Sequence, residues 1–381
     1  MRHDIVITDP FEQETIARIQ KQTDFKSLRL KRLLDLPDLT QKNNSPVKFI
    51  TDAIISLPRF KDFDIVTTPK MVSVKNNFDD LNTPKDHPSR RESDTYYLDD
   101  SHILRTHTTV MWPFYLGDSE VVRRLKDEGH VAALSSGIVF RKDEIDRKHF
   151  PAFHQIDGLY ICKKEEQVIV QKDLEAIEED IVKSIFGDEV RFRFLVDTFP
   201  FTDPSVQIEV WSNNDWLEVV GSGLVHTQVL RNLGIDPQVY NGWAFGFGLE
   251  RLAMVKMGIS DIRILWSEDP RITKQFTRID SQYKPVSKYP STLRDISFVV
   301  DKSVSLNNYF EIVREYAGNL IEEAKLLDTY ENAEKFGKDK VSYTFRIVYC
   351  SPERTLTNEE VNAIQDKIRA KTESELHAVL R

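Results

Sequence analysis

The strand pattern between residues 151 and 248 restricts this chain to a small set of folds. Apolar, β-branched and aromatic segments follow one another at short intervals, among them "LYICKKEEQVIV", "RFRFLVDTFPF", "VQIEVW" and "LEVVGSGLV". Consecutive strands joined by hairpin-like turns such as "WSNNDW" favour an antiparallel sheet over a parallel, doubly wound one. The chain also has no GxGxxG motif that opens a helix after a strand and no GxxxxGK(S/T) motif, which argues against a Rossmann domain and a P-loop.

The composition is that of a globular protein with more than one domain. A chain of 381 residues is too long for one ordinary core, and 40% hydrophobic residues are enough for two. The formal net charge of −9 argues against a protein that coats nucleic acid by neutralising phosphates. Cys162 and Cys350 stand in apolar runs without zinc or redox spacing, so we expect buried, unreactive thiols.

Two features bear on where the protein works. The first residues, "MRHDIVITDPFEQETIARIQ", include early acidic side chains and show neither an apolar signal region nor an Arg- and Ser-rich presequence. No apolar run approaches the roughly 20 residues of a membrane span. We therefore expect a cytoplasmic protein without membrane contact, with the mitochondrial matrix as the alternative.

The sequence pattern divides the chain into four segments. Residues 1–60 are polar and helix-forming and predict an N-terminal helical extension. Residues 61–277 carry the mixed α+β pattern of an antiparallel sheet flanked by helices. The polar residues 278–288 predict a linker. Residues 289–381 have β-α-β-β-α order, which fits a ferredoxin-like domain.

The stretch "RKDEIDRKHFPAFHQID" carries the first chemical signal. "GIVFR" predicts a strand that ends at Arg141, "KDEIDRKH" a charged turn and "FPAFHQIDGLYI" a second strand. Period-two alternation places Phe153, Gln155 and Asp157 on one face of that strand. Such a surface suits an adenylating site, since a guanidinium grips phosphate, a ring stacks on a base and a carboxylate takes an ammonium. A half-buried hairpin with solvated charges is the alternative.

The stretch "GWAFGFGLERLAMVKMGISDIR" carries the second chemical signal. Gly246 and Gly248 alternate before a periodic helix whose first turn contains Glu250 and Arg251. This pattern predicts a strand whose backbone lies close to a ligand, followed by a helix whose arginine meets terminal phosphates. Glycines that serve only a tight strand-to-helix turn are the alternative.

A third stretch, "DTFPFTDPS", places Phe199 and Phe201 on either side of a proline. Two aromatic rings on one face before a turn can line an apolar pocket. The alternative is that both rings belong to the core.

Together and in this order, the three stretches resemble the class II phenylalanyl-tRNA synthetases, in the single-chain form of mitochondria and some bacteria. "FRKDEIDRKHFPAFHQID" resembles motif 2 of that family, "GFGLERL" resembles motif 3, and "FDIVTTP" is similar to motif 1. "HPSRRESDTYYL", "LRTHTT" and "WLEVVGSGLVH" are similar to the connecting signatures. "YPSTLRDISFVV" and "ERTLTNEEV" resemble the ferredoxin-fold anticodon-binding domain. The resemblance extends from about residue 63 to the C-terminus.

The resemblance implies that L-phenylalanine is activated by ATP, with Mg²⁺, to phenylalanyl-adenylate and then transferred to the 3′ end of tRNA(Phe). Catalysis would rest on positioning and electrostatics, with no side-chain nucleophile. The implied catalytic residues are Arg141 on the α-phosphate, Arg251 on the γ-phosphate and His149. The implied ATP-binding residues are Arg141, Asp143, His149, Phe153, Glu218, Gly248 and Arg251, with Phe153 stacked on adenine and Glu218 as the Mg²⁺ ligand.

The resemblance also implies a phenylalanine pocket, which departs in part from the family pattern. Its residues would be His107, Thr109, Gln155, Asp157, Phe199, Phe201, Ala244 and Gly246. The rings of Phe199 and Phe201 would pack edge-to-face on the substrate, and Ala244 and Gly246 would form the wall. The family usually has Ser at Thr109, Gln at Trp112, Glu at Asp157 and Cys at Ser222.

Two other interpretations stay open at this point. A ligase for another aromatic amino acid would fit the departures at Trp112 and Asp157. An inactive tRNA-binding paralogue is disfavoured, because Arg141, Glu218 and Arg251 are all present and a binding module has no use for them. Since the catalytic and anticodon-binding parts share one polypeptide, the resemblance implies a monomer.

Overall fold

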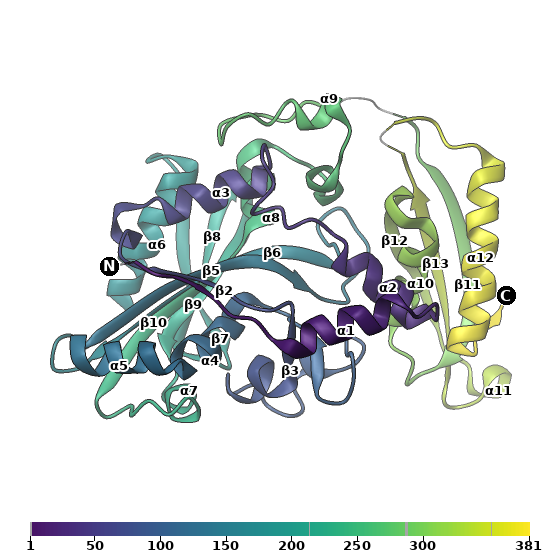
Figure 1. Ribbon diagram of the computed structural model, residues 1–381. Helices are drawn as coiled ribbons and strands as arrows, with labels where there is room; N and C mark the ends of the chain where they lie inside the picture. Colours follow the sequence, from purple (N-terminus) through teal and green to yellow (C-terminus); the bar gives the residue numbers. More distant parts are fainter. Residues whose placement is uncertain (1, 213, 286–288, 352) are drawn as a thin grey trace.

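The computed structural model describes residues 2–212, 214–285, 289–351 and 353–381. Its largest feature is an eight-stranded sheet (Figure 1). In spatial order its strands are β1 (Asp4–Val6), β2 (Asp64–Thr67), β5 (His130–Phe140), β6 (Ala152–Lys163), β10 (Tyr240–Gly248), β9 (Asp215–Val225), β8 (Thr202–Ser212) and β7 (Phe192–Phe199). Every neighbouring pair from β5 to β7 is antiparallel, which confirms the sheet predicted from the strand pattern. One residue of the predicted "WSNNDW" turn, number 213, lies outside the described residues.

The other edge of the sheet is parallel and includes the start of the chain. β1 pairs with β2, and β2 pairs with β5, both in parallel. β1 lies within the segment that the sequence predicts as helical, because a strand of three residues is too short to show period-two alternation. The helices of that segment are α1 (Pro10–Gln20), α2 (Phe25–Leu34) and α3 (Pro46–Ile55).

A proline follows the end of β2. Pro69 separates β2 from β3 (Met71–Ser73), which pairs with β4 (His102–Leu104) in a small antiparallel sheet. Proline lacks the N–H that a continued strand would donate, so the chain leaves the large sheet at this point.

The two faces of the large sheet pack against different helices. On one face, the large side chains of Trp243, Phe245 and Phe247 share a core with α3, α6 (Gln171–Phe186) and α8 (Leu249–Met257). On the other face, Ala244 shares a core with residues of α4 (Met111–Gly117), α5 (Ser119–Glu128) and α7 (Thr227–Asn232). Alternation along β10 therefore separates an aromatic face from a face of small residues.

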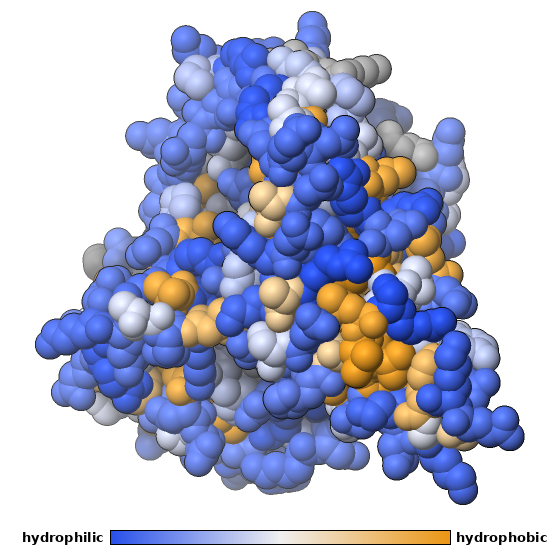
Figure 2. Space-filling model, turned by 90° about the vertical axis from the view of Figure 1, so that its right-hand side faces the viewer, coloured by the Kyte–Doolittle hydropathy of each residue, from blue (hydrophilic) through white to orange (hydrophobic). Residues whose placement is uncertain are grey.

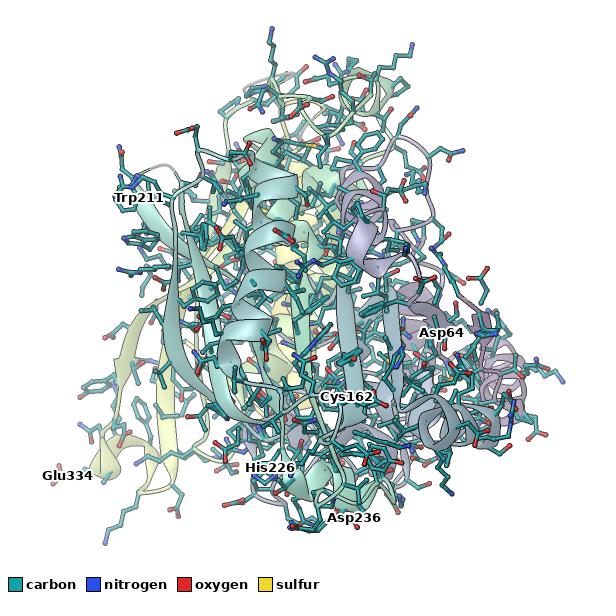
Figure 3. The ribbon with its side chains drawn as sticks, turned by 90° about the vertical axis from the view of Figure 1, so that its left-hand side faces the viewer. Asp64, Cys162, Trp211, His226, Asp236 and Glu334 are labelled. Carbon is teal, nitrogen blue, oxygen red and sulfur yellow. The ribbon has the colours of Figure 1, made fainter. Side chains whose placement is uncertain are left out.

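A buried carboxylate ties the parallel edge together. Asp64 of β2, labelled in Figure 3, is 1% exposed and accepts hydrogen bonds from the Tyr115 hydroxyl (2.6 Å) and Arg124 Nη2 (2.5 Å). The backbone N–H of His3 donates to its other oxygen (2.9 Å). Burial raises the pKa of Asp64, but the hydrogen bonds from Arg124, Tyr115 and His3 together lower it below the usual value. The residue before β1, together with β2, α4 and α5, therefore meets on one charged group.

Replacing Asp64 by asparagine is expected to lower the free energy of unfolding by about 1.5 kcal/mol at pH 7, since hydrogen bonds to a charge are lost. Because the pKa of Asp64 is lowered in the folded state, this contribution is present above the unfolded-state pKa and disappears as the pH falls through the folded-state value. Urea unfolding at pH 7 and pH 3 measures both effects. Asp62→Asn, at an exposed neighbouring position, is the matched control.

The C-terminal part forms a separate four-stranded sheet with its own core. Its elements are β11 (Thr292–Asp301), α10 (Leu306–Ala317), β12 (Ile321–Tyr330), α11 (Ala333–Phe336), β13 (Lys340–Tyr349), α12 (Asn358–Leu376) and β14 (Val379–Leu380). The strand order is β12-β13-β11-β14, with antiparallel pairs, and residues of both long helices join the core of β11 and β13. The outer face of this part is mostly hydrophilic (Figure 2). The predicted β-α-β-β-α order is confirmed for the long elements, and the short α11 and β14 add to it.

Other expectations have mixed outcomes. Cys162 is a free, buried cysteine, but Cys350 is also free and only half-buried, so the prediction of two buried thiols is half right (Figure 3 labels Cys162). Among the described residues, no helix combines the length and the apolar character that crossing a bilayer requires. The predicted segment boundaries stay predictions, and residues 286–288 of the predicted linker lie outside the described residues.

Candidate active site

The candidate site is built on the paired strands β6 and β10. In their antiparallel register Gln155 lies opposite Gly248 and Asp157 lies opposite Gly246. Residues opposite one another share a face, so Gly246 carries no side chain beside the carboxylate. A Cβ at Gly246 would lie 3.2 Å from Asp157 Oδ1, whereas one at Gly248 would meet no atom within 4 Å. The backbone of β10 is thus left bare beside Gln155 and Asp157.

Arg141 follows β5 directly and turns toward β6. Its Nε donates to the carbonyl oxygen of Thr106 (2.9 Å), and its guanidinium lies 5.0 Å above the centre of the Phe153 ring. Burial lowers the pKa of Arg141. The negative charges of Asp143 and Asp157 oppose that shift, and the positive charge of Arg251 adds to it. The two arginines are therefore close enough to repel each other, although 110 positions separate them.

Arg251 stands in the first turn of α8 and reaches the neighbouring strand β9. Its Nη1 donates to the carbonyl oxygen of Glu218 (3.0 Å), and its guanidinium is exposed. The exposed Glu218 lies opposite Glu209, whose carboxylate is paired with Arg193 (2.5 Å). The described residues hold no group of three or more His, Cys, Asp or Glu side chains that could bind a metal ion. One open carboxylate matches Mg²⁺, which takes one or two carboxylates and completes its shell with water and phosphate oxygens.

The loop between β5 and β6 adds His149 and Asp143. The Nδ1 of His149 bonds to Asp146 Oδ2 (2.9 Å), and this bond is the main reason why its pKa is raised. Asp143 raises the pKa of His149 further, and Arg251 lowers it. The nucleotide residues expected from the motifs therefore meet in one electrostatic neighbourhood.

Asp157 lies at the other end of the site as a buried carboxylate. Its two oxygens accept hydrogen bonds from the hydroxyls of Thr109 (2.8 Å) and Thr108. Burial raises the pKa of Asp157 to about 6, although those hydroxyls and the charges of Arg105 and Arg141 oppose the rise. The carboxylate is therefore mostly ionised at neutral pH. Gln155 is tied to the same segment, because its Oε1 accepts from the backbone N–H of Thr108 (3.3 Å).

His107 stands between the two ends of the site. Burial and the charge of Arg141 lower its pKa to about 3, so its imidazole is neutral. Its Nδ1 is buried and, within the described part of the chain, has no hydrogen-bond partner. That atom is free for a ligand.

Three aromatic rings form an apolar wall next to these polar groups. The rings of Phe199 and Phe201 are parallel within 6°, with centroids 6.0 Å apart. Phe201 also meets Trp112 edge-on (5.9 Å, 78°) and lies 6.0 Å from the His107 ring. Ala244 is 2% exposed in the core that holds Trp112 and contacts Phe201. The expected phenylalanine residues therefore lie together.

Sequence reasoning missed some residues that shape the site. The resemblance implies Thr109 but not its neighbour Thr108 as a pocket residue, although the hydroxyls of both donate to Asp157. Arg105 is 3% exposed and donates to the carbonyl oxygens of Ile138 (2.8 Å) and Thr68 (3.0 Å), which no local pattern signals. The resemblance places Ser222 near the pocket, but its hydroxyl donates to Val206 O (3.3 Å) and lies near Glu178, on the face covered by α3, α6 and α8.

The glutamate of "GFGLERL" has a structural role, because it holds a buried histidine. Glu250 is 3% exposed and accepts from the backbone N–H of His154 (2.7 Å), and its Oε1 lies 2.6 Å from His154 Nδ1. The backbone N–H of Leu39 donates to His154 Nε2 (2.9 Å), so in the neutral ring the proton sits on Nδ1. The imidazole joins the N-terminal segment, β6 and α8 and thereby fixes the turn that presents Arg251.

A cavity of about 530 Å³ lies elsewhere. Its lining residues include Phe63, Tyr160, Trp243 and Lys172, on the face of the sheet that α3, α6 and α8 cover. None of the expected site residues lines this cavity.

Comparison with known proteins gives a consistent result. Residues 33–276 match the model of the class II core domain of tRNA synthetases (F), and residues 287–381 match the ferredoxin-fold anticodon-binding domain. The chain is 38% identical over 359 residues to the chloroplastic/mitochondrial phenylalanine–tRNA ligase of Arabidopsis thaliana, covering 90% of this chain and 80% of that protein. It is 33% identical to the mitochondrial phenylalanine–tRNA ligase of Saccharomyces cerevisiae, over 98% of this chain and 93% of that protein. The mitochondrial phenylalanine–tRNA ligase of Mus musculus is 35% identical, over 82% of this chain and 73% of that protein.

These matches confirm the resemblance drawn from the motifs and the fold class of an α+β catalytic core with a ferredoxin-fold domain. They give no support to the cytoplasmic location, since all three relatives named here are organellar. The class II core, the anticodon-binding domain and the relatives agree along nearly the whole chain. The chain belongs to the single-chain phenylalanine–tRNA ligase family of class II aminoacyl-tRNA synthetases.

Proposed function

We propose that this chain attaches phenylalanine to tRNA(Phe), using ATP to form phenylalanyl-adenylate first. The observation that carries the proposal is the placement of both arginines at the paired strands β6 and β10. Arg141 lies over the Phe153 ring and Arg251 stands in the first turn after Gly248, on strands that also carry the buried Asp157 beside two phenylalanine rings. A triphosphate supplies the negative charge that would relieve the repulsion between the two guanidinium groups. The rings and the carboxylate suit the two ends of phenylalanine.

The nucleotide end would work through placement of charge. Arg141 would bind the α-phosphate and stabilise the charge that develops during in-line displacement, while Arg251 would hold the γ-phosphate. Phe153, which already stacks under a guanidinium, would carry the adenine ring. Asp143 and His149 would contact the nucleotide from the loop, and the bare backbone at Gly248 would allow its close approach.

Glu218 would hold Mg²⁺, which on binding would neutralise phosphate oxygens. Its carboxylate is exposed beside the backbone oxygen that Arg251 contacts, so the same strand would place metal and arginine around one triphosphate.

The amino-acid end would recognise both charges of phenylalanine and its ring. Asp157, held by Thr109, would take the ammonium, and the free Nδ1 of His107 together with Gln155 would address the carboxylate and ammonium. Phe199 and Phe201 would pack on the benzyl ring, and Ala244 with Gly246 would form the wall. An edge-to-face contact of this kind is worth about 0.5–1.5 kcal/mol beyond buried area.

The size of the pocket is testable at Ala244. Replacing Ala244 by glycine is expected to admit para-halogenated phenylalanine, because the side chain removed is buried in the wall. Pyrophosphate exchange with para-chlorophenylalanine is expected to rise about tenfold relative to phenylalanine, the size expected of a small change in an apolar pocket. An unchanged ratio would take Ala244 out of the wall.

The function is tested by ATP–pyrophosphate exchange with each of the twenty amino acids, followed by aminoacylation of purified tRNA. Exchange that depends on phenylalanine supports the proposal. Preferred exchange with another aromatic amino acid would favour the alternative raised by Trp112. Absence of exchange with all twenty would point to an inactive tRNA-binding paralogue.

The C-terminal ferredoxin-fold domain would bind the anticodon end of tRNA(Phe). We also propose that the protein acts as a monomer in the mitochondrial matrix, supported by the names of its relatives and by both parts lying on one chain. Sedimentation of the purified protein and organelle fractionation test these two points.

A further inference from the structure

The C-terminal domain holds the loop that carries two of the proposed nucleotide-binding residues. This segment, called here the clamped segment, comprises residues 142–147 and lies between Arg141 and His149. Asn307 Nδ2 donates to the carbonyl oxygen of Lys142 (3.2 Å). Arg314 Nη2 donates to the carbonyl oxygens of Asp143 and Glu144, the second at 2.5 Å. Figure 1 shows the C-terminal domain beside the end of β5 and the start of β6, which this loop connects.

The clamped segment also enters the hydrophobic core of the C-terminal domain. Ile145 is 5% exposed and belongs to the core formed by β11, β13, α10 and α12. Its carbonyl oxygen accepts from the backbone N–H of Ala324 in β12 (3.0 Å). Arg147 forms an ion pair with Glu322 of the same strand. Five of the six residues of the clamped segment therefore contact the C-terminal domain, which begins more than 140 positions further along the chain.

Arg314 is itself fixed in place. Its Nη1 donates to Glu311 Oε1 (2.6 Å), and Glu311 is 3% exposed. The other oxygen of Glu311 lies 3.4 Å from Arg29 Nε, and Arg32 pairs with Glu315 one turn further along α10. Helix α2 therefore braces α10, and α10 braces the loop.

A loop with this many contacts loses little conformational entropy when a ligand binds, because most of the ordering has already occurred. We propose that Arg314 is a positioning residue for ATP, which acts through the clamped segment to hold Arg141, Asp143 and His149 in their binding arrangement. This inference rests on the proposed function. It makes activation of the amino acid, a step that needs no tRNA, dependent on the anticodon-binding domain.

The kinetic test is Arg314→Ala in the full chain, assayed by phenylalanine-dependent pyrophosphate exchange without tRNA. Misplacing a binding loop by a fraction of an ångström is expected to raise the KM for ATP about tenfold and leave the KM for phenylalanine within twofold. Arg314→Lys, which retains a charged donor, is expected to recover part of the loss. Arg354→Ala, whose exposed side chain pairs with Glu360, is the matched control and is expected to retain both constants.

The second measurement does not depend on catalysis. Hydrogen exchange of the loop amides between residues 142 and 149 is expected to accelerate at least fivefold in Arg314→Ala and to stay at the parent rate in Arg354→Ala. If the parent protein lacks exchange activity, the proposed function fails while this measurement still decides whether the loop is clamped. An unchanged loop, or an equal rise in both KM values, would overturn the role of Arg314.

Discussion

Arg141→Ala is expected to lower phenylalanine-dependent pyrophosphate exchange by about 10³-fold, the loss typical of removing one preorganised donor to developing charge. The half-buried guanidinium packs against Phe153 and Thr106, where its interaction with a phosphate would be stronger than in water. The turnover number measured at saturating ATP and phenylalanine reports the effect. Arg141→Lys is expected to recover little, because an ammonium cannot offer the planar, bidentate geometry of guanidinium.

Arg123→Ala is the matched control for this experiment. Arg123 lies on α5, is 62% exposed and pairs with Glu120 and Asp127, so its loss is expected to leave exchange unchanged. Thermal unfolding of both variants separates a chemical defect from a folding defect. If Arg141→Ala retains more than a third of the parent rate, the assignment of the two arginines to one triphosphate is wrong.

Glu178→Gln is expected to stabilise the protein at neutral pH. Glu178 of α6 is 0% exposed, and neither carboxylate oxygen has a hydrogen-bond partner among the described residues. Burial raises its pKa to about 8, and the nearby Ser222 hydroxyl offsets only part of the rise. The folded state must therefore take up a proton, which costs up to about 3 kcal/mol at pH 7 by linkage. Glutamine is neutral and has nearly the same shape.

The sign of this effect depends on pH. A folded-state pKa above the unfolded value means that stability is fully present below the unfolded pKa and is lost as the pH rises toward about 8. The gain from Glu178→Gln is therefore expected to be small at pH 5 and largest at pH 8. Denaturant unfolding at both pH values measures the gain, with Glu165→Gln, exposed two residues after β6, as control. A gain that does not change with pH would contradict a protonated Glu178.

The sequence predicted the parts of the site that local patterns encode. Period-two alternation placed Phe153, Gln155 and Asp157 on one strand, and the register of β5, β6 and β10 agrees with the hairpin and with the glycines opposite. The strand-to-helix turn at Gly248 followed from composition and periodicity in the same way. Such features depend only on neighbours in the chain, so the sequence reports them directly.

The features that were missed depend on distant partners. Ile145 stands alone among charged residues in "KDEIDRKH", which the sequence predicts as a charged turn, yet it is buried in the core of the C-terminal domain. Glu250 was noted only as part of a helix start, and its partner His154 lies 96 positions away. Buried polar pairs and cross-domain contacts have no local periodicity, so only the three-dimensional structure reveals them.

The bond from Leu39 to His154 has a consequence for chimeric proteins. A segment taken from a relative and grafted at the amino end must supply a backbone N–H at position 39, and the side chain there is a secondary matter. A proline at that position would remove the donor and leave Nε2 of His154 without this hydrogen bond, while Glu250 still holds the proton on Nδ1. Junctions for such grafts are therefore better chosen by main-chain geometry around this position than by sequence identity.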